Sequence, residues 1–225
     1  MNILYIGSSG ALSLLPFKKL LTTNHCIAAV GIYQPVEFKN KIIALKNESL
    51  TLAANSHDLA VIDLSQPTAQ ILQQCKILSI DLILISCYSK RLPEALVNLA
   101  SKGCFNMHPS LLPKYRGCEP IFWQMQQASD VGVSWHRVIH DFDAGDIVAQ
   151  KKVILDDGAS YAEINFDLAN AGAALMPSML QAIAENKLVD TPQDPALSSY
   201  QPYPAEPDFV VDVAWSAQQA YNLMC

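Results

Sequence analysis

The sequence of 225 residues lacks the patterns that mark disulfide-rich, zinc-binding and membrane-spanning proteins. Its six cysteines are scattered, with no CxxC pair and no cysteine–histidine spacing typical of zinc, so we expect neither disulfides nor a structural metal. No apolar stretch approaches the roughly 20 residues that span a bilayer. Lys18 and Lys19 follow the apolar N-terminal run instead of preceding it, which argues against a signal peptide. We therefore expect a cytoplasmic protein that does not bind membranes.

Charged residues are also scarce. Only 16% of the residues are charged and 51% are hydrophobic, which is typical of a compact globular protein rather than a disordered one. The 15 basic and 21 acidic residues give a net charge of −6, so we expect no general attraction to the phosphates of nucleic acids. Internal repeats and low-complexity tracts are absent. The length suits one α/β domain of ordinary size.

Short apolar runs alternate with segments of helical length along most of the chain. Continuous apolar runs bounded by polar turns are typical of parallel strands that are covered on both faces. We therefore expect the α/β class, with a Rossmann-like, mostly parallel open sheet and helices on both faces. The expected strands span residues 2–7, 27–33, 59–64, 81–87, 103–107, 131–139 and 146–155, and the expected helices lie near residues 12–20, 49–57, 67–79, from 93 onward and 159–186.

Two proline-rich segments interrupt this pattern. Residues 108–118 are rich in proline and glycine and predict an irregular loop. Residues 191–207 hold five prolines and no lysine or arginine, which predicts an extended, largely unpaired link. A short strand and the first turns of a helix are expected after it. We divide the chain into a catalytic domain, residues 1–190, and a proline-rich link with a short C-terminal segment, residues 191–225.

Polar side chains gather at the end of one expected strand. Asn106 and His108 close the strand over residues 103–107, and ligands of open parallel sheets bind beyond such strand ends. Residues i and i+2 of an extended segment project to the same side, so the amide and the imidazole face one crevice. An amide that stabilises an oxyanion beside an imidazole that moves a proton suits acyl transfer. Taken alone, the pair also fits a capping asparagine and a structural histidine.

Asp143 lies in the turn between the last two expected strands, directly before Ala144 and Gly145. A carboxylate there can orient His108 or hold a water that relays protons. An aspartate before a small residue and a glycine is also a common turn former. By strand alternation His136 can face the same crevice, as can the loop residue His140. The residues alone do not decide between a catalytic and a structural role for these side chains.

The segments FNMHPSLLPKYRG (105–117) and GVSWHRVIHDFDAGDIVAQKKV (132–153) closely resemble, together, the signature of the formyltransferase family that uses 10-formyltetrahydrofolate. That family includes methionyl-tRNA, glycinamide ribonucleotide and nucleotide-sugar formyltransferases, and the folate hydrolase and dehydrogenase that share their domain. The resemblance covers residues 1–187 in element order and is densest over residues 80–155. It implies a formyltransferase that needs 10-formyltetrahydrofolate and no metal.

The resemblance also implies roles for particular residues. Asn106, His108 and Asp143 match the catalytic residues of the family, and Ser110 and His136 are expected to support them. The donor is expected to bind between the segment SCYSKRL and the loop that ends at Asp143. The donor-binding candidates are Ser86, Tyr88, Ser89, Lys90, Arg91, Leu92, Ile139, His140, Asp141 and Phe142. A solvated helix start is the alternative for the two basic residues of this set.

In the mechanism that the resemblance implies, an unprotonated amine attacks the formyl carbon that is attached to N10 of the folate. Asn106 and protonated His108 are expected to hold the oxygen of the tetrahedral intermediate. Asp143 is expected to carry protons, through water, towards the N10 leaving group.

The sequence departs from the family pattern at its two ends. The first turn, GSSGALSLLPF, lacks the G-x-G-S-N phosphate cradle of the purine enzyme, which disfavours glycinamide ribonucleotide as acceptor. The link and the segment DVAWSAQQAYNL resemble the passage into a second, barrel-like domain in tRNA- and sugar-type members, and we expect that domain to be absent here. Without it, tRNA binding has little electrostatic support.

The expected acceptor is an amino-sugar nucleotide or another small or carrier-bound amine. Glu119, Trp123 and Trp135 are candidates to line the acceptor side, and each is equally compatible with packing. Two other functions remain as alternatives: hydrolysis of the donor by the same residues, and a folate-binding module without catalysis. The sequence predicts no oligomeric state.

Overall fold

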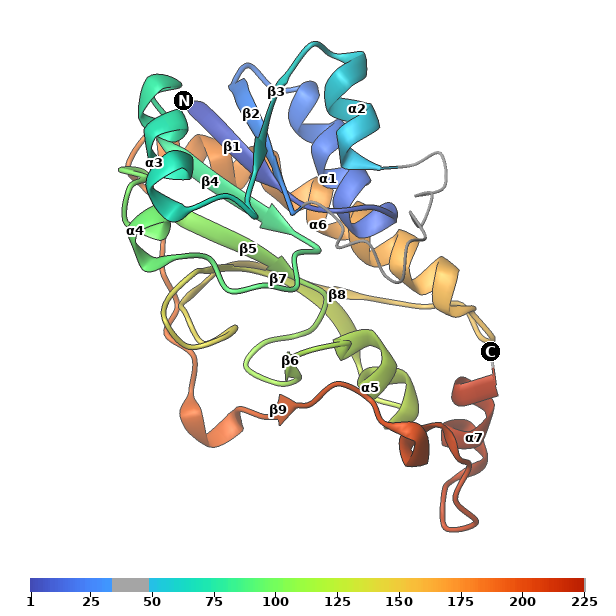
Figure 1. The fold of residues 1–225 in the computed structure, drawn as a ribbon. Coiled ribbons are helices and arrows are strands. Elements are labelled where there is room, and N and C mark those ends of the chain that lie inside the picture. Colours follow the sequence, from blue (N-terminus) through green and yellow to red (C-terminus); the bar gives the residue numbers. More distant parts are fainter. Residues whose placement is uncertain (34–48, 225) are drawn as a thin grey trace.

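A seven-stranded sheet forms the centre of the molecule in the computed structural model, which describes residues 1–33 and 49–224 (Figure 1). The strand order is β3-β2-β1-β4-β5-β7-β8. The first five pair in parallel, and β7 and β8 run antiparallel. The strands are β1 (Asn2–Ile6), β2 (Cys26–Ile32), β3 (Ala60–Asp63), β4 (Leu82–Ser86), β5 (Cys104–His108), β7 (Val131–Arg137) and β8 (Ile147–Val153). This confirms the expected mostly parallel sheet. The proline at position 35, expected to end the second strand, lies outside the described residues.

Helices cover both faces of the sheet (Figure 1). The helices α1, α2 and α6 lie on one face, and α3 and α4 lie on the other. The long helix α6 opens with a capping box between Ser160 and Glu163. The helices are α1 (Ala11–Leu21), α2 (Leu50–Ser56), α3 (Thr68–Ile77), α4 (Glu94–Val97), α5 (Pro120–Gln126), α6 (Tyr161–Ala184) and α7 (Ala217–Met224).

Helix α5 is not among the elements that the sequence predicts. It begins at Pro120, which suits a first helical turn. The preceding residue, Glu119, has a left-handed φ of 50° and makes no side-chain cap hydrogen bond, so the usual polar start signal is missing. The helix is short and follows directly on an irregular loop.

Two hydrophobic cores hold the sheet from both sides. Alternate side chains of β1 divide between them: Tyr5 packs with Phe17 of α1 in one core, and Ile6 lies with Ile71 of α3 in the other. All four side chains are buried. Strands packed on both faces have little freedom to shift. The carboxyl ends of β4 and β5 are therefore fixed positions.

The proline-rich link over residues 191–207 lies mostly outside strand pairing, as expected, but three of its residues pair with distant segments. A two-residue strand β9 (Tyr200–Gln201) pairs in parallel with β6 (Arg116–Gly117), so the loop over residues 108–118 also contains a regular element. Thr191 forms an isolated bridge with Ile147. We call residues 191–202 the strap. The strap finds its hydrogen-bond partners in distant loops, which its own composition does not reveal.

The expectation of a short strand after the strap is wrong. Residues 206–209 form a short 3₁₀ turn, η2 (Glu206–Phe209), and the chain then continues without regular pairing to α7. Val210, Val211 and Val213 are exposed instead of facing a neighbouring strand. A second 3₁₀ turn, η1 (Pro195–Leu197), lies within the strap. The division of the chain at residue 190 stays a prediction.

Within residues 1–33 and 49–224, no helix combines the length and the apolar character needed to cross a membrane. No group of three or more histidine, cysteine or acidic residues in these ranges is arranged to hold a metal ion. The five cysteines among them are free thiols.

Candidate active site

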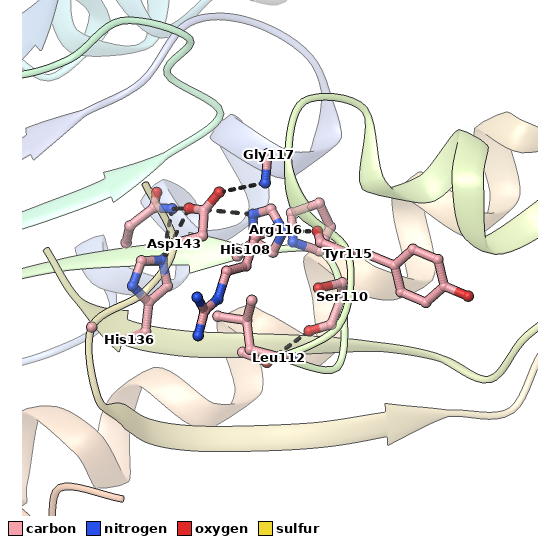
Figure 2. Close-up of polar contacts among 12 residues, drawn as sticks. His108, Ser110, Leu112, Tyr115, Arg116, Gly117, His136 and Asp143 are labelled. Atoms are coloured by element: carbon pink, nitrogen blue, oxygen red, sulfur yellow. Dashed lines mark hydrogen bonds and ion pairs between the residues drawn. The ribbon is translucent and has the colours of Figure 1, made fainter. Parts of the chain in front are cut away.

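The polar residues of the two signature segments meet beside the carboxyl end of β5 (Figure 2). Asn106 of β5 pairs in register with His136 of β7, because β7 runs antiparallel beside it. His108 follows two residues later on β5 and is buried. Asp143 comes from the connection between β7 and β8. Sheet register therefore places three of the four side chains, and a loop places the fourth.

Asn106 joins the imidazole of His136 to the carboxylate of Asp143. Its Nδ2 lies 3.1 Å from Nε2 of His136 and 3.4 Å from Oδ1 of Asp143. Nδ1 of His136 lies 2.8 Å from the carbonyl oxygen of Arg137. A carbonyl oxygen only accepts, so this contact assigns a proton to Nδ1 of His136. The amide nitrogen of Asn106 thus lies within contact distance of both side chains.

His108 lies in a buried position with one of its two nitrogens held by the backbone. Nε2 lies 2.7 Å from the carbonyl oxygen of Tyr115, which assigns the proton of the neutral ring to Nε2. Nδ1 lies 3.6 Å from Oδ1 of Asp143. Burial lowers the pKa of His108, and the Asp143 carboxylate and the Tyr115 carbonyl oppose that effect only in part. The ring is therefore neutral at neutral pH, with the lone pair of Nδ1 towards Asp143.

The carboxylate of Asp143 is held between two loops and the histidines (Figure 2). Its Oδ2 accepts a hydrogen bond of 2.9 Å from the backbone N–H of Gly117, and its Oδ1 lies 3.3 Å from Nε2 of His136. Burial acts to raise the pKa of this carboxyl, but His108, His136 and the Gly117 N–H more than offset it, and the pKa lies well below its ordinary value. Asp143 is therefore an anion across the physiological pH range.

Ser110, a predicted supporting residue, holds the loop over residues 108–118 rather than facing the crevice. It is fully buried, its hydroxyl donates to the carbonyl of Lys114, and its own carbonyl accepts from the hydroxyl of Ser134. Ser134 also accepts from the backbone N–H of Leu112 and from the side-chain amide of Gln150. No sequence motif marks Ser134, although its place two residues before His136 on one strand puts both on the same face.

Gln124 of α5 is a second loop anchor that the sequence did not reveal. Its Nε2 donates to the carbonyl oxygens of Pro109 and Pro120, each at 2.8 Å, and so ties the start of the loop to the start of α5. The strap holds the middle of the loop. The backbone N–H of Tyr115 donates to the hydroxyl of Ser199 at 2.8 Å, and that of Arg116 donates to the carbonyl of Ser199 at 2.9 Å.

A pocket of about 300 Å³ opens beside the Asp143 turn. Arg91, Asp141 and Phe142, three of the donor-binding candidates, contribute to its wall. The guanidinium of Arg91 lies 4.6 Å from the centre of the Phe142 ring and 3.2 Å from Nε2 of His140, so the loops after β4 and β7 meet as the sequence predicts. The remaining lining residues are Arg116, Ala144, Ser198, Ser199 and Tyr200.

The other donor-binding candidates take different positions. Ser86 is fully buried, and its hydroxyl donates to the carbonyl of Leu12. Leu92 belongs to the core beneath α3 and α4. The ammonium of Lys90 lies 4.5 Å from the centre of the Tyr33 ring, ahead of α4 rather than in its first turn. The remaining members of the set are half-buried or exposed: Tyr88, Ser89 and Ile139.

Of the acceptor-side candidates, the two tryptophans are packing residues. The indole N–H of Trp135 donates to the carbonyl of Gly172 in α6, and that of Trp123 donates to the carbonyl of Pro202 at the end of the strap. Both side chains are buried. Glu119 is exposed at the end of the loop, where its carboxylate accepts a hydrogen bond of 3.0 Å from the hydroxyl of Tyr161.

Comparison with known proteins finds formyltransferases both by sequence and by fold. Residues 34–180 match the family model described as Formyl transferase. The methionyl-tRNA formyltransferase of Moorella thermoacetica is 31% identical over 232 residues, which cover 99% of this chain and 71% of that protein. The enzyme of the same name from Carboxydothermus hydrogenoformans is 29% identical over 223 residues, with coverages of 99% and 71%.

The fold is also that of a solved formyltransferase. The N-formyltransferase from Helicobacter canadensis, crystallised with folinic acid and dTDP-3-aminofucose, aligns with a TM-score of 0.74. The two sequences are 18% identical, and the alignment covers 99% of this chain and 79% of the other. At this identity the likeness concerns the fold alone.

Proposed function

Since the chain belongs to the formyltransferase family, we propose that it transfers a formyl group from 10-formyltetrahydrofolate to a primary amine, with Asn106, His108 and Asp143 as catalytic residues. The observation that carries the proposal is that Asn106 and His108 both approach the carboxylate of Asp143, with one imidazole nitrogen of His108 left free to take a proton. An amide donor, a neutral imidazole and an anion are the groups that acyl transfer to an amine requires.

In this reaction a bond forms between the amine nitrogen and the formyl carbon, and the bond from that carbon to N10 breaks. Negative charge develops on the formyl oxygen, and a proton passes from the amine to N10. We assign Asn106 as the donor to that oxygen. Its 3.4 Å contact with Oδ1 of Asp143 is the weaker of its two contacts, and is the one that a substrate oxygen can replace.

His108 takes the proton that the attacking amine loses. The resemblance implies an imidazolium from the start, but burial lowers the pKa of His108, so in our proposal the ring begins neutral and becomes charged during the reaction. Nδ1 is the nitrogen that faces Asp143, and the carboxylate then stabilises the imidazolium before the proton moves on to N10.

The pocket beside the Asp143 turn fits the chemistry of a reduced folate donor. The Phe142 ring offers a flat apolar surface, and the guanidinium of Arg91 suits a carboxylate of the glutamate tail. The structure from Helicobacter canadensis was solved with folinic acid, which supports a donor of this class. We therefore propose donor binding at the loops after β4 and β7, with backbone groups contributing beside the side chains.

For the acceptor we propose a primary amine on a small molecule, with an amino-sugar nucleotide as first candidate. The Helicobacter canadensis structure contains dTDP-3-aminofucose, whereas the relatives described above at 31% and 29% identity are methionyl-tRNA formyltransferases. The net charge of −6 gives little attraction for tRNA phosphates. A carrier-bound aminoacyl group is the second candidate.

The test is an acceptor screen with the purified chain and 10-formyltetrahydrofolate. The amines are a dTDP-amino sugar, methionyl-initiator tRNA and an aminoacyl carrier protein, and absorbance follows release of tetrahydrofolate. We expect turnover that depends on one of these amines and a formylated product by mass spectrometry. Formate release without amine would indicate a hydrolase instead. Folate binding without any turnover would favour a binding module.

A further inference from the structure

The side chain of Gln193 in the strap joins the Asp143 turn to Arg116. Its Nε2 donates to the carbonyl oxygens of Asp143 at 2.8 Å and Gly145 at 2.6 Å. Its Oε1 accepts from Nε of Arg116 at 3.0 Å and from Nη2 at 2.7 Å. Both donors and the acceptor of one amide are therefore in use. These contacts link three segments that are far apart in the sequence.

The turn that carries Asp143 needs support from outside. Asp143 has a left-handed φ of 53°, a conformation that is uncommon for residues other than glycine, although aspartate tolerates it better than most. Gly145 is equally constrained, because a Cβ there would lie 2.0 Å from the carbonyl oxygen of Arg137. Gln193 binds the carbonyls of both residues and so fixes the turn at its two ends.

We call the hydrogen bonds of Gln193 to the Asp143 turn and to Arg116 the clamp. Its second side is the segment that binds the Asp143 carboxylate. Gly117, whose N–H donates to Oδ2 of Asp143, directly follows Arg116. The strap also packs closely against this segment, and a Cβ on Gly117 would lie 2.4 Å from the carbonyl oxygen of Gln201. Gln193 therefore holds both the residue that supplies the carboxylate and the segment that binds it.

We propose that Gln193 is a positioning residue for formyl transfer, which sets the Asp143 carboxylate between the Gly117 N–H and His108 without touching either substrate. Its kinetic consequence rests on the proposed function, whereas its effect on the geometry does not. A clamp that served stability alone would change the melting temperature and leave turnover unchanged. A positioning residue changes turnover more than it changes substrate binding.

The kinetic test compares Gln193→Ala with Gln201→Ala. Gln201 is a matched control, because it lies in the same strap and pairs through its backbone, and its side chain makes no hydrogen bond within the described residues. We expect Gln193→Ala to lower kcat by about 10- to 100-fold, since a displacement on the order of 1 Å has effects of that size. KM for the donor should change by less than about twofold. Equal kcat in the two variants would overturn the proposal.

Gln193→Glu separates the two halves of the clamp. Glutamate keeps an oxygen for the Arg116 guanidinium but replaces the N–H donors with a carboxylate oxygen that faces the carbonyls of Asp143 and Gly145. We expect a loss of kcat at least as large as in Gln193→Ala. Full activity in this variant would mean that the contact with the turn is dispensable, and the proposal would fail.

Hydrogen exchange measured by mass spectrometry tests the geometry without any assay of activity. Peptides that contain the Gly117 amide and the turn over residues 141–146 should exchange faster in Gln193→Ala than in the wild-type chain and in Gln201→Ala. Unchanged exchange in both peptides would overturn the proposal whatever the chain catalyses. Faster exchange in a chain that transfers no formyl group would leave the clamp standing and contradict the proposed function alone.

Discussion

The two halves of the candidate site are positioned in different ways. Asn106 and His136 lie on neighbouring strands and face each other because the ladder between β5 and β7 sets their register. Asp143 lies on a loop, and side-chain and backbone contacts with residues of other segments, Gly117 and Gln193 among them, hold it in place. The strand half is built into the sheet, whereas the loop half is assembled from contacts between distant segments. The loop half should therefore lose its geometry more easily.

The sharpest test of this comparison is removal of the charge on the loop half. Asp143→Asn keeps the size of the side chain but removes the anion that stabilises a charged His108. We expect formyl transfer to fall by about 10³-fold or more, with folate binding retained, as measured by kcat and by fluorescence titration of the folate. Asp130→Asn is a matched control, because Asp130 pairs with Lys152 at the surface. Near-normal transfer by Asp143→Asn would remove Asp143 from the mechanism.

The strand half has its own test at Asn106. Asn106→Ala removes the proposed donor to the formyl oxygen, and kcat should fall by about 10²-fold, as for other oxyanion donors. The melting temperature should stay close to that of the control Asn98→Ala, an exposed asparagine, because the register of β5 does not depend on this side chain. A large loss of stability with little loss of kcat would assign Asn106 a structural role.

The contact between the strap and the loop can be tested through stability. Gly117→Ala adds a Cβ at 2.4 Å from the carbonyl of Gln201, at a residue with φ of 98°. Gly10→Ala is the control, because Gly10 also has a positive φ, of 78°, but no atom of residues 1–33 and 49–224 lies within 4 Å of the added Cβ. We expect Gly117→Ala to cost about 1–3 kcal/mol more than Gly10→Ala in urea unfolding. Equal losses would mean that the strap moves aside at little cost.

The smallest effect concerns pH. The pKa of His108 in the folded chain lies below its ordinary value of 6.5. As the pH falls below 6.5, His108 therefore takes up a proton in the unfolded chain before it does so in the folded chain, and the free energy of unfolding decreases. Asp143 adds to acid sensitivity only below its ordinary pKa of 3.8. The fall in melting temperature between pH 7.5 and 5.5 should thus be smaller in His108→Asn than in the wild-type chain. An unchanged fall would place the sensitivity elsewhere, for example at His25, whose pKa burial also lowers.

Much of the fold follows from local patterns in the sequence. The expected strand over residues 81–87 is β4, and the expected helix over residues 159–186 is α6, because continuous apolar runs and helical length are properties of single segments. Helix α5 was missed since it has no polar cap. The contacts of the strap have no local signal. They depend on partners that are distant in the sequence, as Gln193 on Arg116, and no window of sequence contains both.

The candidate site, too, has parts that follow from local patterns and parts that depend on contacts between distant segments. Strand alternation alone places Asn106 and His108 on one crevice, and antiparallel pairing of β7 brings His136 to it. The approach of Asp143 to His108 follows from no local pattern, and the family resemblance was needed to suggest it. Ser134, Gln124 and Gln193 bind backbone groups of loops, and nothing in the sequence identifies the carbonyl that a serine or glutamine will meet.

The bond between Gln193 and the Asp143 turn also bears on the order in which the molecule is made. During synthesis from the N-terminus, the sheet up to β8 emerges before the strap, and domains fold as their parts become available. A ribosome-bound chain that ends before residue 193 already contains every proposed catalytic side chain but not the clamp on the turn. Its sheet can form while the catalytic carboxylate is still unanchored. Catalytic competence would then arrive later in translation than the fold itself.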